Sequence, residues 1–237
     1  MKYFEVRVAL FFKKEIAYQH VNETLSKNIA LAMLNNDYLK AIHGQSRGFK
    51  PYHFGLPYPT DANTKLYVKS KPYTFHIRSV DDTFLNALIK ELYEHKGLDF
   101  KVIGYEFSQK RQYFIDKIST VSSAILTMPT DIAKNRHWIV SDGDIEMVMQ
   151  RIIANLEKKH TQFFDEKITA PVDCISYFEI TNKVPILIHY KRAKFLTNKF
   201  VIGFNSDEIS QKLAFTAMAC GLLEKGTHGF GYCLRSQ

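Results

Sequence analysis

The apolar residues of this chain follow one order of elements twice, and this repetition constrains the fold more than any other feature of the sequence. In the first half, residues 2–12 read as a strand, and Val21, Leu25, Ile29 and Met33 then recur at the spacing of one helix face. We expect that helix to end near residue 36. The segments expected to follow it are a loop over 37–51, extended chain over 52–59 and 66–79, a helix that Gly97 ends, and a strand over 98–114.

The second half repeats this order. Ile145, Val148, Ile152 and Leu156 mark a long helix face, and a second apolar helix ends at Gly221. The extended segments expected around these helices are 119–128, 174–180, 184–195, 200–204 and 229–235. Each half therefore reads as strand, helix, two strands, helix and strand, with one additional strand in the second half.

This repeated order predicts an α+β protein made of two tandem ferredoxin-like (RRM-like, βαββαβ) domains, because each such set can bury its two helices against one sheet. We place the boundary near residue 115, which gives domains 1–115 and 116–237, each large enough for its own core. The chain has no linker rich in Pro, Gly or Ser, so we expect the two domains to pack closely.

Composition argues against several classes of protein. Hydrophobic residues make up 46% of the chain, so a packed core is expected. No run of about 18 apolar residues predicts a membrane span. Cys174, Cys220 and Cys233 are scattered and form no CxxC pair, which favours neither disulfides nor a zinc site. We therefore expect a cytoplasmic protein with no cofactor.

The charge points to a class of partner. A net charge of +8 favours a polyanion such as nucleic acid, although many basic proteins bind none. Asp142, Asp144 and Glu146 stand where the long helix should begin, a position that favours capping over metal binding. No HxH or HExxH grouping of histidines occurs, so we predict no metal site.

The chain closes on a glycine-rich segment, EKGTHGFGYCLRSQ. Its glycines follow a helix and precede a strand, whereas dinucleotide and P-loop motifs follow a strand and open a helix. Two interpretations remain open. The glycines can allow a tight turn and close packing, or they can let a polyanion approach the backbone beside Lys225 and His228.

A tandem ferredoxin-like chain that ends in such a loop resembles the CRISPR repeat-processing endoribonucleases of the repeat-associated mysterious protein superfamily. Their closing motif is G-x-G, a short basic stretch and G-hydrophobic-G, which GLLEKGTHGFGYCL matches at Gly221, Lys225, Gly229 and Gly231. Leu223 departs from the motif, since the family usually has a glycine there. The segment 138–160 is also similar to the family's second-domain helix.

The resemblance implies RNA cleavage without metal, by attack of a 2′-hydroxyl that leaves 2′,3′-cyclic phosphate and 5′-hydroxyl ends. The family's catalytic histidine lies in the loop after the first helix, where this chain has His43, and many relatives place a lysine near the position of Lys50. Histidine suits proton transfer near neutral pH, and lysine supplies positive charge for the phosphorane. Without the resemblance, His43 would be read as a helix-end residue and Lys50 as a solvated lysine.

The tyrosine that many relatives contribute from their first helix has no counterpart at the matching position. Tyr38, nearest the expected loop, is our candidate catalytic tyrosine, and Tyr18 is the alternative; either could instead only pack. Some relatives use paired histidines, so His53 is a reserve candidate, although its place on an expected strand favours a structural role.

Basic residues and the closing loop supply the candidate RNA contacts. The segment HYKRAKF places Lys191, Arg192 and Lys194 near a predicted hairpin, and the resemblance implies that such a hairpin can grip the stem of the repeat. Lysines on an exposed edge strand can equally serve to prevent edge pairing, so these three residues carry both interpretations. The candidate RNA-binding residues are Arg47, Lys191, Arg192, Lys194, Lys225, Gly226, His228, Gly229 and Gly231.

The resulting hypothesis is a metal-independent endoribonuclease that cuts CRISPR repeat transcripts into guide RNAs. Its partners would be the repeat RNA and, in addition, other subunits of a CRISPR effector complex, with the chain acting as monomer or homodimer. One alternative is a non-catalytic RNA-binding subunit of such a complex. The other is a basic ferredoxin-like protein that binds no RNA.

Overall fold

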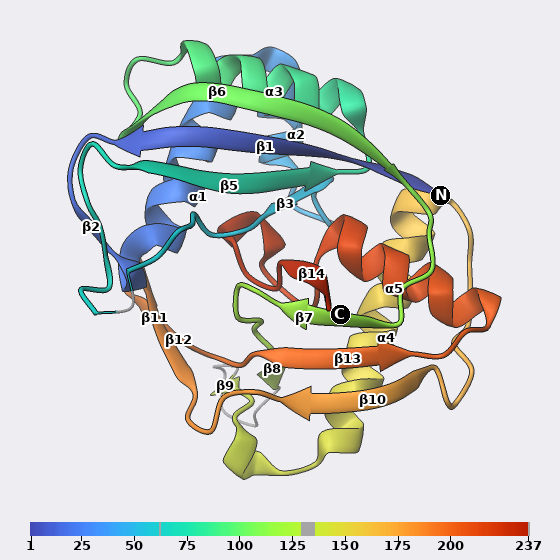
Figure 1. The fold of residues 1–237 in the computed structure, drawn as a ribbon. Helices are drawn as coiled ribbons and strands as arrows, with labels where there is room; N and C mark the ends of the chain where they lie inside the picture. Colours follow the sequence, from blue (N-terminus) through green and yellow to red (C-terminus); the bar gives the residue numbers. More distant parts are fainter. Residues whose placement is uncertain (62, 129–135, 237) are drawn as a thin grey trace.

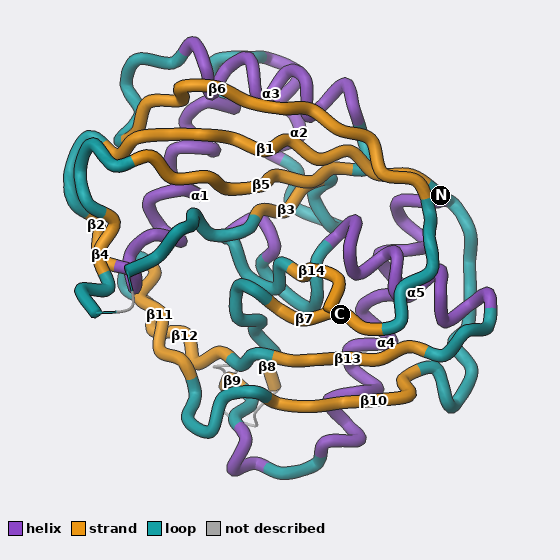
Figure 2. The backbone as a smooth tube through the Cα atoms, in the orientation of Figure 1, coloured by secondary structure: helices purple, strands orange, loops and turns teal. Residues whose placement is uncertain are grey.

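The computed structural model describes residues 1–61, 63–128 and 136–236, and it contains two four-stranded antiparallel sheets. In Figure 1 the sheet of the first half lies above the sheet of the second half, with the N-terminus on the right-hand side and the C-terminus nearer the centre. Figure 2 shows the same path as a tube, in which the loop that joins the two sheets descends on the right-hand side.

The first sheet has the strand order β3-β5-β1-β6, which is the order of a ferredoxin-like unit. β1 lies at its centre and pairs with both β5 and β6. The main elements are β1 (Lys2–Phe12), α1 (Val21–Met33), β3 (Tyr52–Phe54), β5 (Pro72–Ser79), α3 (Asp82–Glu94) and β6 (Phe100–Arg111). The short ones are β2 (Ile16–Ala17), the 3₁₀ turn η1 (Tyr18–His20), α2 (Asp37–Gly44) and β4 (Leu66–Tyr67).

The second sheet has the order β10-β13-β7-β14, which repeats the first one strand for strand. Its main elements are β7 (Lys117–Thr120), α4 (Ile145–Phe164), β10 (Ile175–Ile180), β13 (Phe200–Phe204), α5 (Glu208–Cys220) and β14 (Cys233–Ser236). The short ones are β8 (Thr127–Met128), β9 (Arg136–His137), η2 (Val140–Asp142), β11 (Ile186–Tyr190), β12 (Ala193–Thr197) and η3 (Gly226–His228). The prediction of an α+β protein with two ferredoxin-like units is thereby confirmed.

The loop expected over 37–51 is wrong in its first half, because Asp37–Gly44 forms helix α2. The side chain of Asn36 accepts a hydrogen bond from the Leu39 amide and caps this helix, and Leu39 and Ile42 bury its apolar side. The true loop covers only 45–51. His43 consequently sits on the last turn of a helix rather than in a loop.

Two strands of the second half are shorter than expected. The regular pairing of the segment 119–128 in the second sheet ends at Thr120, and the chain then forms isolated bridges at Ala124 and Ile125 before it pairs as the short β8. The last strand begins at Cys233 rather than at residue 229, because Gly229 and Gly231 have positive φ values of 79° and 67° that no strand accepts.

The predicted hairpin near Lys191 is confirmed, and it reaches across to the first half of the chain. Strands β11 and β12 pair around a turn at Lys191 and Arg192. The Lys191 amide donates to the Glu23 carboxylate at 2.7 Å, and the Tyr190 hydroxyl lies 2.8 Å from the Ser26 hydroxyl. The hairpin therefore packs on α1.

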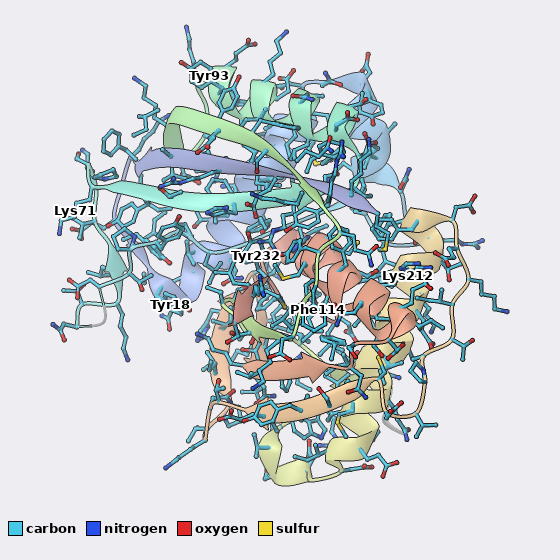
Figure 3. All side chains as sticks on the ribbon, turned by 45° about the vertical axis from the view of Figure 1, so that its right-hand side comes forward. Tyr18, Lys71, Tyr93, Phe114, Lys212 and Tyr232 are labelled. Atoms are coloured by element: carbon cyan, nitrogen blue, oxygen red, sulfur yellow. The ribbon has the colours of Figure 1, made fainter. Side chains whose placement is uncertain are left out.

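Each sheet carries its own hydrophobic core, and a buried arginine joins the two. Arg78, on β5, donates to the backbone carbonyls of Met218 and Cys233 in the second half and to the carboxylate of Glu5. The Tyr232 hydroxyl donates to the same carboxylate, and this tyrosine lies between the two sheets in Figure 3. The helices of the described residues include none that is both long and apolar enough to cross a membrane.

Candidate active site

A groove of about 380 Å³ runs along α1 where the two halves of the chain meet. The first half contributes His43 and Lys50 to its lining, and the second half contributes Lys191 from the hairpin and His228 from the closing segment. Four residues predicted from the sequence for RNA chemistry, spread over most of the chain, therefore line one groove.

His43 lies half-buried at the end of α2. Its Nδ1 atom is buried and has no hydrogen-bond partner among the described residues. Burial of the ring, together with the nearby charge of Lys50, lowers the pKa of His43 below its ordinary value. The imidazole is therefore neutral at neutral pH, the form that accepts a proton.

Lys50 lies beside His43, seven residues further along the chain. Its ammonium group donates to the His43 carbonyl oxygen at 2.5 Å, and burial lowers its pKa. The loop that carries Lys50 is held by the second half, because the Gln162 side chain both accepts from and donates to the backbone of Phe49, at 2.8 and 2.6 Å. The position of Lys50 thus depends on α4.

The two candidate tyrosines lie outside the residues that line the groove. Tyr38 is exposed on α2, and its hydroxyl donates to the Asp81 carboxylate at 2.9 Å. Partial burial, followed by that hydrogen bond and charge, raises the pKa of Tyr38 to about 12. Tyr18 lines a separate hollow beside Leu66 and Leu187.

The glycines of the closing segment are each crowded by neighbouring atoms, which favours the packing interpretation. A Cβ atom at Gly221 or Gly226 would lie 2.9 Å from His53, and one at Gly229 would lie 2.6 Å from the Phe54 ring. A Cβ atom at Gly231 would overlap the Leu222 carbonyl oxygen. These positions require glycine for fit alone, whatever approaches the loop from outside.

His53, the reserve histidine, forms part of this packing. It is fully buried on β3, neither ring nitrogen has a hydrogen-bond partner among the described residues, and its ring faces Tyr232 at 5.3 Å. Burial, then the charges of Arg78 and Lys159, hold the pKa of His53 well below its usual range. A neutral ring inside the fold supports the closing segment and has no access to the groove.

Two residues that the sequence analysis did not single out fix the closing segment in place. Lys159, buried on α4, donates to the carbonyl oxygens of Gly221 and Leu223 at 2.6 and 2.8 Å, and burial lowers its pKa to about 8. Asn22, on α1, donates to the His228 carbonyl oxygen at 2.9 Å. Lys159 falls three positions after Leu156 on an apolar helix face, and that spacing could have indicated that Lys159 is buried.

His228 and Lys225 carry the polar side chains of the closing segment. The His228 ring lies 4.7 Å from the ring of Tyr190, and burial, with the charges of three lysines, lowers its pKa to about 4. Lys225 is exposed, with its ammonium group 5.4 Å from the ring of Phe195. A second hollow beside the groove is lined by both residues and by Lys50.

The other predicted basic residues do not line the groove. Arg47 is exposed in the loop before Lys50, Arg192 is exposed at the hairpin turn, and Lys194 is exposed on β12. Exposed cations at these places can add positive charge around the groove without fixing a ligand.

The acidic residues before α4 act as helix caps. Asp144 accepts a hydrogen bond from the Met147 amide at 3.0 Å, and Asp142 accepts one from the Ile139 amide at 2.9 Å. Asp142 also pairs with Arg136. In the described ranges, no three His, Cys, Asp or Glu side chains come together as metal ligands would.

No family model matches this chain. Over 242 residues, the sequence is 23% identical to the CRISPR-associated endoribonuclease Cas6 2 of Methanocaldococcus jannaschii. The similarity covers 96% of this chain and 97% of that protein, so it includes both sheets and the groove between them.

Solved structures share the fold over almost the whole chain. A CRISPR-associated Cas6 protein has a TM-score of 0.72 with 18% identity, covering 99% of this chain and all of that one. A RAMP protein described as binding different RNA substrates has a TM-score of 0.73 with 16% identity over the same shares. A Cas6-related protein of Pyrococcus furiosus has a TM-score of 0.69 with 16% identity, covering 98% of each chain.

Proposed function

We propose that this chain is a member of the Cas6 family of CRISPR-associated endoribonucleases and that it cuts CRISPR repeat RNA by a metal-independent reaction. The observation that carries the proposal is the groove in which His43 and Lys50 of the first half face Lys191 and His228 of the second. A half-buried histidine of lowered pKa beside a lysine is a combination that suits proton transfer next to a phosphate.

In the proposed reaction, the 2′-hydroxyl oxygen next to the scissile bond attacks the phosphorus atom. The neutral imidazole of His43 takes the hydroxyl proton as the P–O2′ bond forms. The bond from phosphorus to the 5′ oxygen then breaks, and that oxygen takes up a proton. The products are a 2′,3′-cyclic phosphate and a 5′-hydroxyl, so atoms and charge balance without any other reactant.

Lys50 acts in this scheme on the charge of the phosphorane. An ammonium group that is partly withdrawn from water interacts more strongly with a phosphate oxygen than a fully solvated one does. Its lowered pKa also makes it a better proton donor to the departing 5′ oxygen than an ordinary lysine. Tyr38 remains a prediction from the sequence, with its hydroxyl on Asp81 outside the groove.

The repeat RNA would extend from the groove over the surrounding basic surface. Arg47, Arg192, Lys194 and Lys225 are the exposed cations that we assign to its phosphates. The closing segment from Gly226 to Gly231 would present its outer backbone to the RNA, with its inner side packed on the first half. Assembly with other subunits of an effector complex, and a monomeric or homodimeric state, belong to the same proposal.

The test is to incubate the purified protein with a panel of repeat RNAs in EDTA and to identify the product ends. We expect cleavage with cyclic phosphate ends, and none when the nucleotide at the cut site is 2′-deoxy. Cleavage that needs added metal, or that continues at the 2′-deoxy site, would overturn the mechanism. Tight binding without cleavage would instead support a non-catalytic RNA-binding subunit. If the protein neither bound nor cut any of the RNAs, the alternative of a basic ferredoxin-like protein that binds no RNA would stand.

A further inference from the structure

Tyr190 brings a phenol into the groove from the second half of the chain. It is the last residue of β11 and lines the groove together with His43 and Lys50. Its ring lies 4.7 Å from that of His228, and its hydroxyl lies 2.8 Å from the Ser26 hydroxyl on α1. This residue was not among the candidates from the sequence, because its place in the groove depends on how the hairpin crosses to α1.

The direction of the hydrogen bond between Tyr190 and Ser26 follows from the other bond that Ser26 makes. The Ser26 hydroxyl donates its single proton to the Asn22 carbonyl oxygen at 2.8 Å, one turn earlier in α1. It can then only accept from Tyr190. The phenol is therefore the donor, and its O–H is available to any stronger acceptor that enters the groove.

The phenol remains protonated at neutral pH. Burial raises the pKa of Tyr190, the hydrogen bond between Tyr190 and Ser26 opposes that rise, and the negative charge of Glu23 adds to it. A protonated phenol donates a hydrogen bond and does not abstract protons, so Tyr190 cannot replace His43 as a base. The phosphate oxygens of RNA are stronger acceptors than the serine hydroxyl because they carry charge.

The other tyrosine of the groove is not placed for this task. Tyr52 is 6% exposed and stacks on Phe84 at 5.2 Å, with its ring turned into the first core. Tyr190 is half-buried, at the end of a hairpin that the Lys191 amide fixes to Glu23. Among the described residues that line the groove, Tyr190 thus supplies the accessible phenol.

We propose that Tyr190 is a further catalytic residue, whose hydroxyl leaves Ser26 and donates to a non-bridging oxygen of the scissile phosphate. This rests on the proposed cleavage in the same groove. The lysines provide charge without direction, whereas a phenol on a fixed strand adds one directed donor to the phosphorane. The second half of the chain then takes part in the reaction through the hairpin.

The experiment compares the wild type with Tyr190→Phe in single-turnover cleavage of repeat RNA. The phenylalanine keeps the ring on His228 and removes only the donor, so we expect the rate constant to fall by about 10²-fold, the usual effect of losing one such donor. Tyr177→Phe is the matched control, because Tyr177 is exposed on β10 and its hydroxyl bonds, among the described residues, to Glu179 alone, so its rate should equal that of the wild type.

Phosphorothioate RNA separates a direct contact from a structural effect. Sulfur is a weak acceptor, so replacing the contacted oxygen should slow the wild type, and the same replacement should slow Tyr190→Phe much less. Equal losses in both proteins, or a Tyr190→Phe rate equal to that of the wild type, would overturn the role of Tyr190 while leaving the cleavage intact. A wild type that cuts no repeat RNA would overturn both proposals.

Discussion

The two walls of the groove are built in different ways. The first wall, from His43 to Lys50, carries the two residues proposed for the chemistry, and a Cβ atom at Gly44 would meet nothing within 4 Å, although one at Gly48 would lie 3.0 Å from the Gln162 side chain. The closing segment, from Gly221 to Gly231, has a backbone held by buried Lys159 and crowded at every glycine. We assign proton transfer and phosphate charge to the first wall, whereas the closing segment forms a tightly packed backbone surface.

This difference explains why the most recognisable motif of the sequence is not where the chemistry is proposed. A glycine-rich motif is visible because many positions exclude every side chain, and exclusion reflects tight packing. A histidine that transfers protons occupies a single position, and its suitability depends on its burial and on the charges near its ring. The motif identifies how the halves meet, and the neighbouring elements decide what the groove can do.

The largest expected effect comes from adding a single methyl group to the closing segment. Gly231→Ala places its Cβ atom on the Leu222 carbonyl oxygen, so the segment must shift or the protein unfold, and we expect a loss of about 4 kcal/mol or more in the free energy of unfolding. Gly143→Ala is the control, with φ +68° and open space. Its loss should be only about 1–3 kcal/mol, from the backbone conformation alone. Equal losses, measured by denaturant unfolding, would show that packing does not define this wall.

A smaller effect is expected from Lys159→Met. The change removes two hydrogen bonds to the Gly221 and Leu223 carbonyl oxygens, while the lost burial penalty of the charge offsets part of the loss. We expect a decrease of about 2 kcal/mol in the free energy of unfolding. The neighbouring Lys158→Met, at an exposed position, should change it by less than about 0.5 kcal/mol. If Lys159→Met is as stable as the wild type, Lys159 does not fix the closing segment.

The smallest effect concerns the pH dependence of the first wall. Lys50→Gln removes the nearby positive charge, so the pKa of His43 should rise toward its ordinary value. Because the proposed base is the neutral imidazole, the midpoint below which cleavage falls should move to higher pH, and an NMR titration of His43 should move with it. Lys40→Gln, on the exposed side of α2, should leave the midpoint in place. If the midpoint in Lys50→Gln equals that of the wild type, the charge of Lys50 does not influence the pKa of His43.

The sequence predicted the fold well because repeated periodicity reports burial within each half. It missed helix α2, which is only eight residues long and begins with a cap at Asn36 that reads as easily as a turn. The family resemblance singled out Lys50 as well as His43, and the two lie close together because only seven positions separate them. Without the resemblance, nothing in the sequence would have marked His43 as the catalytic histidine.

The rest of the groove could not be predicted from the sequence, because it is made by contacts between distant segments. Tyr190 meets Ser26 across 164 positions, and Asn22 meets His228 across 206. Periodicity and local motifs carry no information on such pairs. The same limit applies to the glycines, whose neighbours His53 and Phe54 belong to the other half.

The most direct test of the division between the walls compares His43→Ala with His228→Ala in single-turnover cleavage of repeat RNA, with RNA affinity measured in parallel. We expect His43→Ala to lose about 10²-fold or more of the rate constant while affinity stays close to that of the wild type. His228→Ala should instead weaken binding and keep most of the rate at saturating protein. A loss of rate confined to His228→Ala, with His43→Ala cutting as the wild type does, would contradict the assignment of the chemistry to the first wall.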